Sequence, residues 1–173
     1  MMKTNNIILI GTIFFVSMAC STTTEPIAGI SSPGVIVSLN YVDENGNNLL
    51  GNDVNTPGAW NESNIDIYYL KKGEKVRVFE SHQDNPKNFQ IWHEDKVGNY
   101  LRLLLNPYVE NNYSSTYIEF PDGEIDTLRI HAELIPDFGI SADKFWYNEE
   151  LLFSKEGEVH GDVGMHKFVK SIN

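Results

Sequence analysis

Apolar and polar residues alternate along two well-separated stretches of the chain. In residues 35–41 every odd-numbered position is apolar or aromatic, and the polar residues Ser38 and Asn40 fall between them. In residues 127–134 the even-numbered positions are apolar and the odd-numbered positions are polar. A period of two is typical of a β-strand with one buried face and one solvent face. The pattern therefore predicts two half-buried strands.

Further short runs with strand character lie between and after these stretches, separated by turn residues. The candidates are residues 65–70, 75–80, 89–93, 100–105, 116–120, 145–147, 151–153 and 167–172. Lys72-Gly73 and Asp84-Asn85-Pro86 interrupt the runs with residues that favour turns. Pro121 to Glu124 predicts a hairpin turn that joins 116–120 to 125–134.

Many short strands, with no stretch at a helical period, favour an all-β fold over an α/β enzyme fold. We expect an antiparallel β-sandwich of about seven to nine strands. An immunoglobulin-like layout fits that number, but it rests on strand spacing alone because the Cys…Trp…Cys marker is absent. The segment 51–63 is expected to be irregular, with room for a short helical turn.

The first residues carry the pattern of a signal peptide. Lys3 supplies a positive charge, residues 7–16 are almost wholly apolar, and Ser17-Met18-Ala19 stands just before Cys20. Ten apolar residues are well short of the roughly 20 that a membrane-spanning helix needs. We therefore expect a cleavable signal over residues 1–19, and the alternative is an ordinary secretory signal beside a chance cysteine.

Cys20 is the only cysteine of the chain, so an intramolecular disulfide is excluded. The polar residues that follow it contain Ser, Thr, Gly and Pro with little apolar pattern, as in a flexible tether. We expect residues 20–32 to be a lipidated cysteine with its tether, and residues 33–173 to form a single β-sandwich domain.

The motif Val16-Ser17-Met18-Ala19-Cys20 resembles the lipobox of bacterial lipoproteins, although Ser17 stands where Leu is usual. The resemblance implies that the Cys20 thiol receives a diacylglycerol and that fatty acyl chains such as palmitate anchor the mature protein. Several acyl chains, at about 0.8 kcal/mol per buried methylene, make such attachment stable. Ser21 gives no acidic inner-membrane retention signal, so we expect the outer membrane, on its periplasmic or cell-surface side.

The charge of the chain excludes two classes of partner. The full chain has a formal charge of −11, and removal of residues 1–19 takes away one base, Lys3, and no acid, which leaves −12. Binding to nucleic acid or to anionic lipid by charge needs a Lys/Arg patch. We expect neither, and the lipid must supply the membrane affinity.

Metal and catalytic motifs are weak. The start of an EF-hand calcium loop resembles the spacing of Asp43, Asn45 and Asn47. The match fails because Gly46 falls at the fourth position instead of the sixth, and Val54 stands at the twelfth, where the loop needs a Glu. A hairpin turn on Asn45-Gly46 is therefore favoured. A second set of candidate metal ligands matches no known spacing; it comprises His160, Asp162 and His166. We expect no metal and no cofactor.

The predicted hairpin holds a cluster of three carboxylates, those of Asp122, Glu124 and Asp126. We interpret them as solvated turn residues rather than as the pair of catalytic carboxylates of a glycosidase. The chain has no G-x-S-x-G nucleophile motif, and its sole thiol lies at the lipidation site. We therefore expect no enzymatic activity.

Trp60, Trp92 and Trp146 are the candidate ligand-binding residues, because flat rings on an exposed sheet face can stack on sugars. Trp60, which follows Pro57-Gly58-Ala59, is the best single candidate by its position in an irregular segment. Trp92 and Trp146 alternate with apolar neighbours and so lie on the opposite face of their strands. The alternative is that these rings belong to the core.

Four runs of residues resemble small uncharacterised lipoproteins of Gram-negative bacteria over about residues 35–153; they are 43–50, 67–70, 121–128 and 145–153. The resemblance implies an extracytoplasmic β domain and carries over no catalytic residue. We therefore expect a membrane-tethered, non-catalytic domain that binds a glycan or a protein of the cell envelope. The alternatives are a structural accessory subunit that pairs through a free strand edge, and a hydrolase.

Overall fold

The computed structural model describes residues 23–24, 34–51, 58–135, 139–159 and 162–171, and these residues contain twelve strands and no helix. The strands are β1 (Thr23–Thr24), β2 (Ile36–Val42), β3 (Asp66–Lys71), β4 (Glu74–Arg77), β5 (Phe89–Glu94), β6 (Gly98–Leu104), β7 (Val109–Glu110), β8 (Tyr113–Glu119), β9 (Ile125–Ile135), β10 (Gly139–Tyr147), β11 (Glu150–Val159) and β12 (Asp162–Val169). The all-β class that the sequence predicts is confirmed. The strand number exceeds the expected seven to nine, partly because β1 and β7 are pairings of two residues each.

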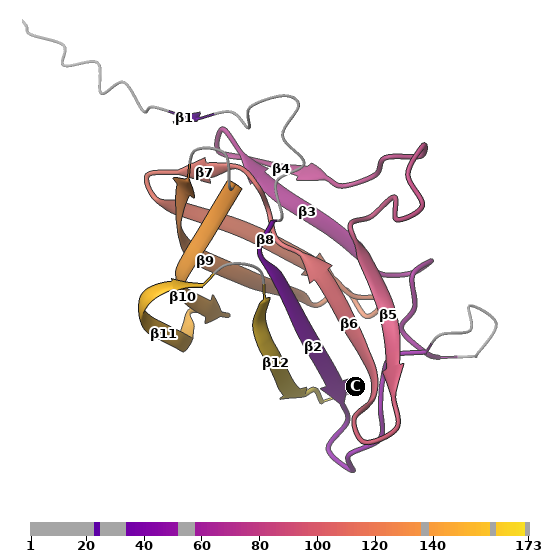
Figure 1. Ribbon diagram of the computed structural model, residues 1–173. Coiled ribbons are helices and arrows are strands. Elements are labelled where there is room, and N and C mark those ends of the chain that lie inside the picture. The colour runs from indigo at the N-terminus through magenta and orange to yellow at the C-terminus, as the bar shows by residue number, and fades with distance from the viewer. Residues whose placement is uncertain (1–22, 25–33, 52–57, 136–138, 160–161, 172–173) are drawn as a thin grey trace, which may run out of the picture.

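The strands form two sheets in an open, sandwich-like arrangement. The larger sheet has eight strands in the order β1-β7-β8-β9-β10-β11, with β3 beside β8 and β4 beside β3. The smaller sheet has the order β12-β2-β6-β5, and Figure 1 shows these four strands side by side. Every pairing between strands is antiparallel except that of β12 with β2.

The β8–β9 hairpin is confirmed, with Thr116 opposite Leu128 and a turn closed by the Phe120 amide on the Glu124 carbonyl at 2.9 Å. The strands β8, β9, β10 and β11 are neighbours in chain order. No known fold subtype is assigned by this order, and the immunoglobulin-like layout stays a prediction.

One core joins the inner faces of both sheets. It takes residues such as Val37 and Leu103 from the smaller sheet and Ile118, Ile130 and Phe145 from the larger one, each at most 1% exposed. The alternation predicted for β9 is confirmed over residues 128–132. It fails at the end of the strand, where the side chain of Leu134 is 40% exposed near the connection to β10.

The prediction that β2 has a solvent face is wrong. Ser38 and Asn40 are 7% and 2% exposed, although they alternate with the core residues Val37, Leu39 and Tyr41. The Asn40 side-chain amide donates to the backbone carbonyl of Asn99 at 2.8 Å. Buried polar groups need such partners, so this hydrogen bond lets a polar residue occupy the interior.

Asp126 is also buried, which corrects its interpretation as a solvated turn residue. Its Oδ1 accepts hydrogen bonds from Lys170 Nζ at 2.7 Å and from Asn148 Nδ2 at 2.9 Å, and its Oδ2 accepts one from the Tyr147 hydroxyl. Lys170 Nζ also reaches Glu124 Oε2 at 3.0 Å. Since Lys170 directly follows β12, this cluster ties the end of the smaller sheet to β9 and β10.

The electrostatics of the cluster agree with its contacts. Burial opposes the charged form of Lys170, but hydrogen bonds to Asp126 and Glu124 outweigh it and raise the pKa of Lys170. Burial and the hydrogen bond to Asp126 raise the pKa of Tyr147. Lys170 therefore stays charged at neutral pH and Tyr147 stays a donor.

Asp66 on β3 forms a second ion-pair cluster, at the outer part of the larger sheet. Arg77 Nη2 donates to its two oxygens at 2.7 and 2.8 Å, and Lys87 Nζ lies 3.0 Å from Oδ1. Burial acts to raise the pKa of Asp66, but the hydrogen bonds from Arg77 and Lys87 lower it below its usual value. The ionised carboxylate therefore holds the segment before β5 against β3.

We expect this cluster to make the protein less stable in acid. Because the pKa of Asp66 is lowered in the folded state, its stabilisation is complete above the unfolded pKa of about 4 and is lost as pH falls through the folded pKa. Urea unfolding measures how far the free energy of unfolding falls between pH 7 and pH 3. This fall should be smaller for Asp66→Asn than for the wild type, by up to about 1 kcal/mol. The control is Asp95→Asn, whose side chain is fully exposed. An equal fall in the free energy of unfolding from pH 7 to pH 3 in the wild type and in Asp66→Asn would contradict this expectation.

Candidate functional site

A groove of about 580 Å³ lies on the outer face of the larger sheet, across β8, β9 and β10. Its aromatic residues are Tyr113, Tyr117 and Trp146. They lie on the outer face because the residues that alternate with them, such as Ile118 and Phe145, are buried in the core. The groove is therefore a surface of the sheet itself, with no core side chain exposed in it.

Strand register brings the groove residues together from distant parts of the chain. Ser115 on β8 stands opposite Arg129 on β9, and Arg129 stands opposite Trp146 on β10. Tyr113 and Tyr117 lie two residues on either side of Ser115 on β8, and Tyr117 faces Thr127. The result is a row of polar and aromatic side chains across three strands.

Arg129 occupies the centre of this row and stacks on aromatic rings. Its guanidinium carbon lies 3.9 Å from the centroid of the Tyr113 ring and 5.9 Å from that of Trp146. The two ring centroids are 6.0 Å apart, with an interplanar angle of 53°. Cation–π contacts of this kind contribute about 0.5–1 kcal/mol at exposed sites, so they favour this position of the guanidinium.

Two tight turns form the rim of the groove. Asn111 and Asn112 join β7 to β8, and Asn148 and Glu149 join β10 to β11; all four have positive φ, between 45° and 71°. Two-residue hairpin turns need this left-handed backbone, which Asn adopts readily and Glu does not. Glu149 therefore places a carboxylate on the rim at a strained position.

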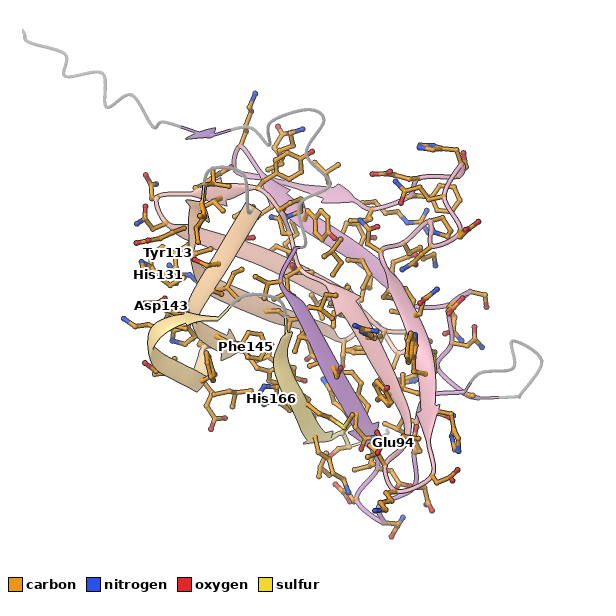
Figure 2. All side chains as sticks on the ribbon, viewed as in Figure 1. Glu94, Tyr113, His131, Asp143, Phe145 and His166 are labelled. Carbon is orange, nitrogen blue, oxygen red and sulfur yellow. The ribbon has the colours of Figure 1, made fainter. Side chains whose placement is uncertain are left out.

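His131 and Asp143 lie close to Tyr113, as the labels in Figure 2 show. His131 Nδ1 is 2.7 Å from Asp143 Oδ1. The His131 and Tyr113 rings meet edge to face, with centroids 5.1 Å apart and an angle of 69°. The Tyr113 ring thus contacts both His131 and Arg129.

The structure buries Trp60, so the prediction that it is the best binding candidate is wrong. Its side chain is 6% exposed and stacks on Phe120, with ring centroids 4.5 Å apart and an angle of 27°. The Trp60 amide donates to the Leu49 carbonyl at 2.9 Å, and residues Leu50 and Trp60 form a β-bridge. This pairing fixes Trp60 beside Leu50, and the Trp60 ring lies in the core.

Trp92 is 43% exposed on β5 of the smaller sheet. The Arg102 guanidinium carbon lies 4.8 Å from the centroid of the Trp92 ring. The Trp92 Nε1 donates to Gln90 Oε1 at 3.2 Å. Because Trp92 and Trp146 belong to different sheets and Trp60 lies in the core, the three tryptophans do not form one surface. Of the three, only Trp146 lines the groove.

β5 stands at one end of the smaller sheet, so its outer edge is one of the described edges at which another strand could pair. The Ile91 amide on this edge donates to Glu62 Oε1 at 3.3 Å. A side chain of the same molecule therefore already occupies one of the edge donors, which weakens the interpretation of this edge as a pairing surface.

The other candidate ligands of the sequence lie in a turn, or lie partly outside the residues whose side chains the structure describes. Asp43 Oδ1 accepts from the amides of Asn45 and Asn47 at 2.9 and 2.7 Å, which confirms a turn there. His166 contacts the Phe145 ring with centroids 5.3 Å apart (Figure 2), whereas His160 and Cys20 lie outside the described residues. Within the described ranges no group of three or more His, Cys, Asp or Glu could hold a metal ion.

Comparison with known proteins gives no relative for this chain. No protein-family model matches it, and no curated protein and no solved structure is significantly similar. In the part of the chain that the structure covers, no helix is long and apolar enough to cross a membrane.

Proposed function

We propose that the groove on the outer face of the larger sheet binds a saccharide, and that the protein is a non-catalytic, lipid-anchored module of the cell envelope. The observation that carries the proposal is the grouping of Tyr113, Tyr117 and Trp146 around Arg129. Sugars present apolar C–H faces that pack on aromatic rings, together with hydroxyl groups that need hydrogen-bond partners. Ser115, Thr127 and Asn111 supply such partners within the same groove.

The size of the groove supports a small ligand. Sites for small molecules commonly measure about 300–1,000 Å³ and combine apolar surface with a few polar groups that fix orientation. The groove, at about 580 Å³, falls in this range. Its position on strands, with only the rim on turns, gives it a rigid floor.

The two carboxylates of the groove favour binding over hydrolysis. Glycoside hydrolysis commonly uses two carboxyl groups that act across the scissile bond. Glu110 Oε1 accepts a hydrogen bond from the Lys72 amide, so this carboxylate holds the rim instead of standing free in the groove. Glu149 is then the remaining carboxylate among the groove residues.

The experiment is a screen of the purified full chain on a glycan array, followed by calorimetric titration of the saccharides that bind. We expect binding to a subset of saccharides that share one sugar type or linkage. Silence on the array and in titration, with the chain folded by circular dichroism, would contradict the proposal. So would binding to envelope proteins alone.

The lipid anchor is supported by the Val16–Cys20 motif and the polar residues after it. We expect the wild-type chain, expressed in a Gram-negative host, to incorporate labelled palmitate and to sediment with the outer membrane. Cys20→Ala should lose essentially all of the label, whereas Ser21→Ala should keep it. Label on the Cys20→Ala variant, or none on the wild type, would show that this interpretation is wrong. Protease treatment of whole cells then distinguishes the cell surface from the periplasm.

A further inference from the structure

Arg129 is the one basic residue among the described residues that line the groove. It is exposed, and its described contacts are the stacked rings of Tyr113 and Trp146. Across the described strands no carboxylate lies within ion-pair distance of its guanidinium. Its neighbours in the adjacent strands, Ser115 and Trp146, carry no charge.

Among the described residues, cations of this acidic chain, with 24 acidic and 13 basic residues, are of two kinds. Arg77 and Lys87 pair with Asp66, and Lys170 pairs with Asp126. Arg129, like Arg102 beside Trp92, lies over an aromatic ring. The guanidinium carbon of Arg129 lies over the Tyr113 ring and near the Trp146 ring. Its N–H groups lie in the plane at the edges, and they match a carboxylate with two parallel hydrogen bonds.

A second cation stands near the same aromatic surface. Lys75 Nζ on β4 lies 3.9 Å from the centroid of the Tyr117 ring, and Tyr117 lines the groove. The ring surface of the groove is therefore flanked by two positive groups. Glu110, the acid on one side of the rim, is engaged with the Lys72 amide.

We propose that the saccharide recognised by the groove is acidic, with a carboxylate on its ring as in a uronic acid, and that Arg129 binds this carboxylate. The inference rests on the proposed function and names the chemical class of its ligand. The sugar ring packs on Trp146 while its carboxylate meets the N–H edge of Arg129. Because the rings of Tyr113 and Trp146 already favour this position of the guanidinium, less side-chain entropy is lost on binding.

The net negative charge of the protein opposes this ligand only at long range. At physiological ionic strength charges are screened over about 8 Å, so the remote carboxylates act weakly on a bound anion. A bidentate contact with Arg129 acts at hydrogen-bond distance and is screened much less. Glu110 and Glu149 are the acidic residues that line the groove.

The test titrates the full chain with matched pairs of sugars, methyl glucuronoside against methyl glucoside and methyl galacturonoside against methyl galactoside. We expect at least one uronoside to bind at least about tenfold more tightly than its neutral counterpart. Arg129→Gln should remove this preference, and Arg129→Lys should keep only part of it because a lysine offers no fork. The control Lys96→Gln makes the same charge change at an exposed site and should leave the preference intact.

The outcomes separate the two proposals. Equal binding of the acidic and neutral sugars, or a preference that survives in Arg129→Gln, overturns the acidic ligand and leaves saccharide binding standing. Failure of every sugar to bind overturns both. Binding of a polyglutamate peptide in place of the sugars also overturns both, since the carboxylate would then come from a protein. Thermal melts of each variant verify that loss of binding is not loss of the fold.

Discussion

Replacing Asp126 with Ala is expected to lower the free energy of unfolding by about 3–5 kcal/mol, the usual cost of breaking a buried ion pair by removing one partner. Asp126 is 1% exposed and accepts hydrogen bonds from Lys170, Asn148 and Tyr147. Its loss leaves the largely buried Lys170 ammonium with Glu124 as its remaining carboxylate, and leaves the Asn148 and Tyr147 donors without this acceptor. In a domain of about this size, 1 kcal/mol shifts the melting temperature by about 2–4 °C, so a fall of about 10 °C is expected.

Urea unfolding and thermal melting both measure this effect. The matched control is Asp122→Ala in the same hairpin, because Asp122 is exposed and its Oδ1 accepts only the Glu124 amide at 3.0 Å among the described contacts. The control should cost less than about 1 kcal/mol. Equal losses for the two variants would mean that the Asp126 cluster does not hold the sheets together.

Replacing Trp146 with Ala is expected to weaken saccharide binding by at least about tenfold, equivalent to about 1.4 kcal/mol. Trp146 has the largest side chain among the groove residues, and its ring centroid lies 5.9 Å from the Arg129 guanidinium carbon. Truncation of an aromatic residue at the centre of a binding site commonly has an effect of this size or larger. Trp146→Phe keeps a ring at the same position and should retain part of the affinity.

The control for this prediction is Trp92→Ala. Trp92 is also exposed and also stacks with an arginine, but it lies on the smaller sheet. Calorimetric titration should therefore give the same dissociation constant for Trp92→Ala as for the wild type. A loss of binding in Trp92→Ala with none in Trp146→Ala would move the site to the other sheet.

Local alternation was enough to predict the strands but not every buried face. On β10, Phe145 and Tyr147 are buried and Trp146 points outward, as the alternation predicts. On β8 the pattern is reversed: the polar residues Ser114 and Thr116 are buried, while tyrosines alternate with them on the outer face.

The reversal on β8 has a physical cause that sequence patterns do not contain. The backbone amide of Asn106 donates to Thr116 Oγ1 at 2.9 Å, and Ser114 Oγ donates to the backbone carbonyl of Asn106 at 2.6 Å. A polar network therefore replaces apolar packing at this end of the core. For this reason the sequence did not identify Tyr113 and Tyr117 as groove residues.

The groove itself depends on contacts between distant residues. Alternation on β9 places Arg129 on the solvent face, but only the register of β8, β9 and β10 sets it between Ser115 and Trp146. The ion pair between Asp126 and Lys170 likewise joins residues 44 positions apart. Trp60 shows the converse, because a bridge to Leu50 buries a ring that its irregular surroundings would leave exposed.

The most direct test of the central claim, that the groove on the larger sheet is the binding site, uses the three indole N–H signals of the full chain labelled with ¹⁵N. Single Trp→Phe variants assign the signals of Trp60, Trp92 and Trp146, which lie in the core, on the smaller sheet and in the groove. During titration with a saccharide that binds, the account predicts a progressive shift of the Trp146 signal, with the other two unchanged. A shift of the Trp92 signal while that of Trp146 stays fixed would contradict it.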